Sequence, residues 1–337
     1  MPVLRRQVPG RLDPGWRMPD DGPSRLAVLR LRILPALTPR RRVQVWYGPL
    51  LALAMLLNML RLLAYARLLP VEAFGEVSAA LLISSSFCML GCFGLLPILQ
   101  RDWPRLALRG QHRRAWILVV QCCAVAIATA LVLGALSATG IRVAGLTGPM
   151  LTMSILCGLT QQLFLVITTE SRSAGNLLAY ARHQFLRGAA VLGVVIAMAS
   201  QGAGAYSLIA AEAVISLSAV LAILIFTPRT GVPKITLLAT AAARGLPKVS
   251  WYEALTMMAV VLVSFAMVNV DRWLAAQALD TIKFGLYSFA VIVLSVAQSC
   301  QGLVNASMFP LIARRQASEG TRGSFRVSMK LSAMVGG

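Results

Sequence analysis

The sequence predicts an all-α integral membrane protein in which two lobes of helices, related by a parallel repeat, surround a central cavity. Two features of the composition favour this class: 58% of the 337 residues are hydrophobic, and the mean hydropathy is +0.73. A third is that apolar runs of about 20 residues recur along the chain, which is the length that a helix needs to cross a bilayer. A helix satisfies its own backbone hydrogen bonds in lipid, so these runs indicate spanning helices.

Eight apolar runs predict eight complete spans, and a ninth begins near Phe325. The eight runs cover residues 45–67, 74–98, 116–138, 143–167, 184–201, 204–226, 250–270 and 284–308. Lysine and arginine alternate between rich and poor connections, with 27 on the side of the N-terminus, four on the other side, and Arg61 within a span. The 27 include Arg182 and Arg187, which the count assigns to the connection between the fourth and fifth spans. Because cytoplasmic loops are enriched in basic residues, the N-terminus is expected to be cytoplasmic. The net charge of +20 is then explained by contact with anionic membrane lipids and not with nucleic acid.

The apolar runs and the charged connections together divide the chain into four predicted parts. Residues 1–42 form a basic cytoplasmic arm, which is expected to be either a surface helix or disordered. Residues 43–228 form a six-span lobe, residues 229–249 a cytoplasmic linker, and residues 250–337 an incomplete second lobe.

One short phrase occurs twice, and it predicts an internal repeat. FGEVSAA (74–80) and FGLYSFA (284–290) both fit F-G-x-x-S-x-A, and LPILQR (96–101) parallels FPLIAR (309–314) further along. The offset is six spans, an even number, so both copies have the same orientation, as in transporters with two parallel lobes. The alternative is that the phrase is only a common way to begin a helix, since its small residues allow close helix contacts.

With these residues the chain resembles the polysaccharide-export branch of the multidrug/oligosaccharidyl-lipid/polysaccharide exporter superfamily, the lipid-linked oligosaccharide flippases. The segments that carry the resemblance are 66–80, 96–102, 270–290 and 305–314. The resemblance implies alternating-access transport of a polyprenyl-diphosphate-linked oligosaccharide across the bacterial inner membrane, for lipopolysaccharide or exopolysaccharide biosynthesis. It also implies polysaccharide polymerase and export proteins as partners. Members usually have twelve or more spans, so this chain is expected to be either truncated, without spans 9–12, or a degenerate copy.

The resemblance further implies that spans 1, 2, 7 and 8 line the cavity, where the substrate would bind. In span 1, Asn58, Arg61 and Tyr65 share one helix face, and the Arg61 guanidinium suits a diphosphate because it can bind in a bidentate manner. Gln298 and Asn305 of span 8 are the other candidate substrate-binding residues. Alternatively, Arg61 extends toward the outer surface or pairs structurally with a carboxylate.

Three further charged residues are candidates for energy coupling or for locking the lobes together. Glu212 in span 6 either couples transport to a proton or cation gradient or, when protonated, bonds a neighbouring helix. Asp271 and Arg272 end span 7, where an ion pair that locks the lobe is expected.

The sequence offers no sign of a cofactor, a metal site or an enzyme. It has no G-x-x-x-x-G-K-[ST] phosphate-binding motif and no His/Cys/Asp cluster suited to hydrolysis. Its six cysteines all lie in apolar runs, where we expect them to be small buried hydrophobic residues.

Two alternatives to a flippase are a cation-coupled multidrug exporter of the same superfamily, which Arg61 disfavours, and a truncated membrane remnant that transports nothing. A membrane glycosyltransferase or polymerase is disfavoured by the short outer loops.

Overall fold

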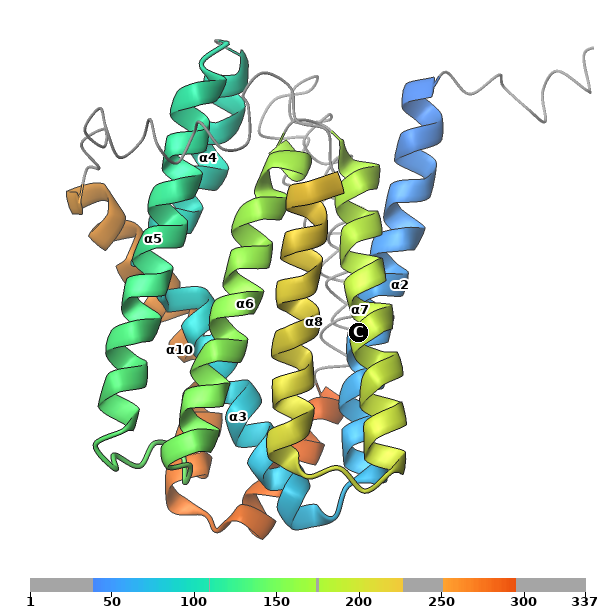
Figure 1. The fold of residues 1–337 in the computed structure, drawn as a ribbon, viewed down its shortest axis with the longest axis vertical. Helices are drawn as coiled ribbons and strands as arrows, with labels where there is room; N and C mark the ends of the chain where they lie inside the picture. The colour runs from blue at the N-terminus through green and yellow to red at the C-terminus, as the bar shows by residue number, and fades with distance from the viewer. Residues whose placement is uncertain (1–38, 109, 174–175, 227–250, 295–337) are drawn as a thin grey trace, which may run out of the picture. The chain divides into compact units, whose positions relative to one another are not determined.

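The computed structural model describes residues 39–108, 110–173, 176–226 and 251–294, and Figure 1 shows them as helices joined by turns. No strand occurs among these residues. By length and composition, seven of their helices can cross a membrane. The predicted all-α membrane class is therefore confirmed. The chain divides into two units, Met1–Arg42 and Val43–Gly337, and every contact discussed below lies within the second.

The helices follow one another with short connections. They are α2 (Pro39–Leu68), α3 (Val71–Leu90), α4 (Leu95–Leu108), α5 (His112–Ser137), α6 (Gly148–Ser173), α7 (Leu177–Ser200), α8 (Ala205–Phe226), α10 (Trp251–Ala278) and a shorter apolar helix, Thr281–Leu294. All except α4 and the last are membrane-length. The predicted eighth span, 284–308, is described only as far as residue 294.

The prediction of one continuous second span over residues 74–98 was wrong. Helix α3 ends at Leu90, and a turn with positive φ at Phe93 (47°) and Gly94 (77°) separates it from α4. Glycine is required here, because a Cβ at Gly94 would lie 2.7 Å from the backbone nitrogen of Met258 on α10. Hydropathy measures only apolar content, so it did not reveal this break in the backbone.

The start of the fifth predicted span, 184–201, was also wrong. Helix α7 begins at Leu177, after Asn176, whose side chain caps the first turn by accepting a backbone hydrogen bond. Arg182 and Arg187, which the loop count assigned to a cytoplasmic connection, therefore lie within a membrane-length helix. Their charges lower the local hydropathy and so conceal the true beginning of the helix.

Helix α6 lies at the centre of the first group of helices. It packs against α3, α5 and α8, and less extensively against α4 and α7. The main cluster of buried apolar side chains joins α2, α3, α6, α7 and α8, and it also includes side chains of α10 and of the helix Thr281–Leu294. A second cluster joins α4 to α5, where the rings of Trp103 and Trp116 meet edge to face at 5.3 Å.

The two copies of F-G-x-x-S-x-A meet at their glycines. A Cβ at Gly285 would lie 2.8 Å from the carbonyl oxygen of Val71 and 3.4 Å from the Cα of Gly75. A Cβ at Gly75 would overlap the carbonyl oxygen of Thr281. Each glycine thus contacts the residue four positions before the other, which is the reciprocal pattern that a two-fold relation produces. This reciprocity supports the predicted repeat, although the division into two lobes stays a prediction.

Candidate functional site

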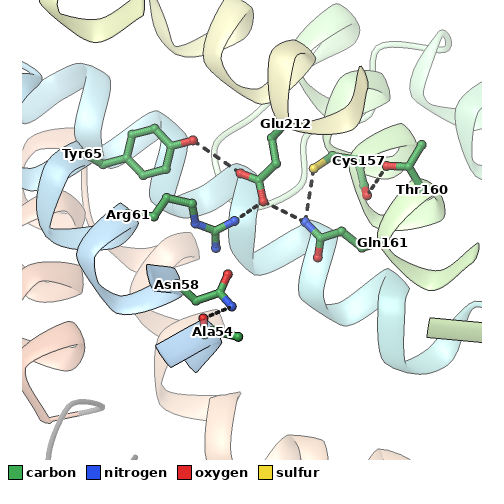
Figure 2. Close-up of polar contacts among 8 residues, drawn as sticks. All are labelled: Ala54, Asn58, Arg61, Tyr65, Cys157, Thr160, Gln161 and Glu212. Carbon is green, nitrogen blue, oxygen red and sulfur yellow. Dashed lines mark hydrogen bonds and ion pairs between the residues drawn. The ribbon is translucent and has the colours of Figure 1, made fainter. Parts of the chain in front are cut away.

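A buried ion pair joins α2 to α8 (Figure 2). The Arg61 guanidinium donates through Nη1 to Oε1 of Glu212. The Glu212 side chain is 0% exposed and that of Arg61 only 12% exposed, so the pair lies between packed helices. A single charge at this depth in a membrane costs several kcal/mol, and the pairing of opposite charges offsets that cost.

Two neutral side chains complete the hydrogen bonding of Glu212. The Tyr65 hydroxyl donates to Oε2 at 3.4 Å, and Nε2 of Gln161 donates to Oε1 at 3.1 Å. Nε2 of Gln161 also lies 3.4 Å from Sγ of Cys157, which is one turn away on α6. With Arg61, the carboxylate accepts from three donors, which suits an ionised group that can only accept. We call Arg61, Tyr65, Gln161 and Glu212 the glutamate cluster.

The local sequence of α2 explains which of its polar residues reach the cluster. Tyr65 follows Arg61 by one turn, so both side chains project from one face toward α6 and α8. Asn58 lies one turn earlier, and its side chain donates to the carbonyl oxygen of Ala54 within the same helix at 3.1 Å. The structure therefore brings Arg61 and Tyr65 together with Glu212, while Asn58 lies beside the cluster without a hydrogen bond to it.

Two residues of this region were not recognised in the sequence. Gln161 carries no charge and lies in an apolar run, so only its position as a polar residue in a span could have indicated it. Arg187, near the middle of α7, was counted as part of a loop. Its guanidinium carbon lies 4.8 Å from the ring centre of Phe164, which is one turn from Gln161 on α6. Within the described part of the chain, no ion pair joins Arg187 to a carboxylate.

The remaining predicted site residues lie elsewhere. Helix α10 continues beyond residue 270 to Ala278, so Asp271 and Arg272 lie inside it. The Tyr287 hydroxyl of the next helix donates to Oδ2 of Asp271 at 2.8 Å, and Arg272 Nε is buried without a hydrogen-bond partner among the described residues. No ion pair joins Asp271 to Arg272 in those residues. Gln298 and Asn305 lie outside the described residues.

A second charged group joins α4 to the beginning of α10. Arg101 donates to Oδ1 of Asp102 at 2.8 Å and to Oε2 of Glu253 at 3.0 Å. These two hydrogen bonds, to Asp102 and then to Glu253, raise the pKa of Arg101 above its ordinary value. The side chains of Arg101, Asp102 and Glu253 are between 26% and 49% exposed, so these ion pairs contribute little to the stability of the protein.

Among the described residues, no group of three His, Cys, Asp or Glu side chains is placed to hold a metal ion. Four of the described cysteines are buried and one is half-buried, and all five are free thiols. The expectation of small buried residues is confirmed for the four and not for Cys123, which is half-buried, and Cys300 lies outside the described residues.

Comparison with known proteins identifies the family. The family model described as "Polysaccharide biosynthesis protein" matches residues 64–336, which is most of the chain. No curated protein and no solved structure matches the chain. The match confirms the resemblance to polysaccharide exporters, and the seven membrane-length helices make the chain a multi-pass membrane protein. The chain belongs to the polysaccharide biosynthesis protein family.

Proposed function

We propose that this protein is a flippase that moves a lipid-diphosphate-linked oligosaccharide across the bacterial inner membrane by alternating access. The family supports a membrane protein of polysaccharide biosynthesis, and the observation that carries the finer proposal is the buried glutamate cluster. A transporter of a membrane-embedded diphosphate needs a cation within its spans, and Arg61 is such a cation. The proposed reaction makes and breaks no covalent bond, and it needs no cofactor.

Arg61 is the group that we propose to bind the diphosphate. Carboxylate and phosphate oxygens are alike as partners for a guanidinium, so Glu212 takes the position of the substrate anion while the protein is empty. Arg61 retains donors for a ligand, because its Nε is buried without a hydrogen-bond partner among the described residues. The substrate would therefore compete with Glu212 for Arg61.

Glu212 is the group that we propose to couple this exchange to protons. Protonation removes the charge of the carboxylate and so weakens its hold on Arg61, which is then free to bind the diphosphate. Tyr65 and Gln161 remain within hydrogen-bond distance of the neutral acid. Once the headgroup leaves, loss of the proton restores the ion pair. Arg187, Cys157 and Tyr65 are the other ionisable groups that act on this pair.

The ion pair also favours an anionic substrate over a cationic drug. A cation exporter of the same superfamily needs an acidic side chain that is available to its substrate. Glu212 already accepts hydrogen bonds from Arg61, Tyr65 and Gln161. The cluster therefore offers a guanidinium to an incoming anion more readily than a carboxylate to an incoming cation.

The test measures leaflet translocation in proteoliposomes that contain a fluorescent polyprenyl-diphosphate oligosaccharide. Arg61→Lys keeps the charge that Glu212 needs but removes the planar fork of donors, so we expect translocation to slow at least about tenfold. Arg114→Gln is the matched control, because Arg114 is an exposed arginine at the start of α5 that donates to Gln111. An imposed pH gradient should change the wild-type rate.

Two outcomes would contradict the proposal. If Arg61→Lys translocates as fast as the wild type, Arg61 is not the diphosphate ligand. If the wild-type protein moves a lipophilic cation and not the diphosphate lipid, the multidrug-exporter alternative replaces the flippase.

A further inference from the structure

A cleft with a cavity volume of about 660 Å³ lies between α7 and α8 and reaches α6. The first half of α7 and the second half of α8 form its sides, and Phe164 of α6 forms its inner end. These halves lie at the same end of the two antiparallel helices, which is the cytoplasmic end in the predicted topology. The cleft is separate from the glutamate cluster, but it approaches it closely. Ile215, which lines the cleft, is one turn from Glu212, and Phe164 is one turn from Gln161.

One side of the cleft is positively charged. Arg182, His183 and Arg187 of α7 line it, with Arg182 exposed and the other two half-buried. His183 and Arg187 are four residues apart, so they lie on one helix face. None of the described residues that line the cleft is acidic. The charge of Arg187 is therefore not neutralised within the cleft.

One of the basic side chains, His183, has a buried polar atom that the described residues leave without a hydrogen bond. His183 Nε2 is buried and has no hydrogen-bond partner among the described residues. Arg187 is held over the face of Phe164, and a ring below the guanidinium does not cover its edge, where the N–H donors lie. Because buried polar atoms are almost always hydrogen-bonded, the unpartnered His183 Nε2 indicates a polar ligand, and the nearby Arg187 guanidinium favours one with acceptor oxygens.

The opposite side of the cleft, formed by α8, is mostly apolar. Ile215, Ala219, Ile223 and Phe226 line it, and Ser218 is the polar side chain among them. A small inorganic anion would leave this surface uncovered, whereas a hydrocarbon chain would cover it. A cationic side and an apolar side in one cleft fit an amphiphile with an anionic head.

We propose that this cleft binds an anionic, phosphate-headed lipid, with the phosphate on Arg187 and His183 and the chain along α8. The chemistry is shared by a polyprenyl diphosphate and by an anionic phospholipid of the bilayer. The choice of a polyprenyl diphosphate rests on the proposed function, which this site would deepen by holding the headgroup one helical turn from the glutamate cluster. Arg187 would then be the cation that the headgroup meets before Arg61.

The test measures equilibrium binding of lipid probes to the purified full chain in a neutral detergent, with native mass spectrometry as the readout. The probes are farnesyl diphosphate, dioleoylphosphatidylglycerol and, as a zwitterionic comparison, dioleoylphosphatidylcholine. We expect Arg187→Gln to weaken binding of the anionic probes at least about tenfold, since a hydrogen bond to a charged group is lost. Ala222→Trp should weaken it similarly by filling the cleft from an exposed position of α8, and Arg114→Gln should leave it unchanged.

The outcomes separate this inference from the proposed function. Tighter binding of farnesyl diphosphate than of phosphatidylglycerol supports a substrate site, and the reverse order supports a site for a bilayer lipid in the same cleft. Arg61→Lys should slow translocation and still bind in the cleft, so a failure of transport does not remove the binding. The inference is overturned if Arg187→Gln and Ala222→Trp both bind as the wild type does. It is also overturned if phosphatidylcholine binds as tightly as the anionic probes.

Discussion

Arg61 and Arg187 both lie well inside membrane-length helices of this protein, and their surroundings differ. Arg61 on α2 meets a fully buried carboxylate, Glu212, whose remaining hydrogen bonds come from a tyrosine and a glutamine. Arg187 on α7 lies 4.8 Å from the centre of the Phe164 ring and, among the described residues, forms no ion pair with a carboxylate. Arg61 thus has a carboxylate in direct contact, whereas Arg187 is within the influence of Glu212 without touching it.

This difference shows that the partner of a buried charge, and not the charge itself, decides its role. An ion pair between packed helices ties those helices together, so removal of one partner leaves the other charged and buried. A cation over an aromatic ring is stabilised by only about 0.5–2 kcal/mol, and a ligand can use its donors. We therefore expect the loss of Glu212, which leaves Arg61 unpaired, to act mainly on stability, and the loss of Arg187 to act mainly on binding.

The largest expected effect is that of Glu212→Gln. This change leaves Arg61 buried opposite a neutral amide, and breaking a buried pair in this way costs about 3–5 kcal/mol. Unfolding of the detergent-solubilised protein, followed by tryptophan fluorescence in denaturant, should show the loss as a lower midpoint. A midpoint equal to that of the wild type would show that Arg61 does not depend on Glu212.

The double variant Arg61→Met/Glu212→Met is the control for that prediction. It removes both charges together and fills their places with apolar chains, so it should recover most of the stability that Glu212→Gln loses. A double variant as unstable as the single one would attribute the loss to packing around α8 and not to the unpaired charge.

The fold was predictable wherever it depends on apolar content and loop charge. Runs of about 20 apolar residues identified the membrane-length helices, and α8 was predicted almost to the residue at 204–226. The break at Phe93 and Gly94 was missed because it is a matter of backbone conformation within an apolar run. The start of α7 was missed because Arg182 and Arg187 lower the hydropathy of a helix that is nevertheless continuous.

The candidate site was only partly predictable, for a related reason. Helical spacing placed Arg61 and Tyr65 on one face, and isolation in an apolar run singled out Glu212. That these residues meet depends on the packing of α2 against α8, which joins positions 151 apart in the sequence. Gln161 and Arg187 acquire their roles only through neighbours on other helices, so no local pattern indicated them.

A smaller effect is expected for Tyr65→Phe. The Tyr65 ring is wholly buried in the main apolar cluster, and phenylalanine preserves that packing. Only the 3.4 Å hydrogen bond to Glu212 is lost, so the free energy of unfolding should fall by about 1 kcal/mol. Tyr206→Phe on α8, where the side chain is exposed, is the matched control and should change nothing. A loss of several kcal/mol in Tyr65→Phe would mean that the hydroxyl supports Glu212 as strongly as Arg61 does.

The smallest effect on stability is expected for Arg187→Met, which tests the other half of the comparison. Methionine keeps an unbranched chain beside Phe164 and removes a charge that no carboxylate of the described residues pairs with. The lost cation–π contact and the relief of a buried charge oppose each other, so the free energy of unfolding should stay within about 1 kcal/mol of the wild-type value. The measurement is the same denaturant midpoint as for Glu212→Gln. If Arg187→Met is instead as unstable as Glu212→Gln, both arginines share Glu212. Arg187 would then not be available as an unpaired cation for a lipid in the cleft between α7 and α8.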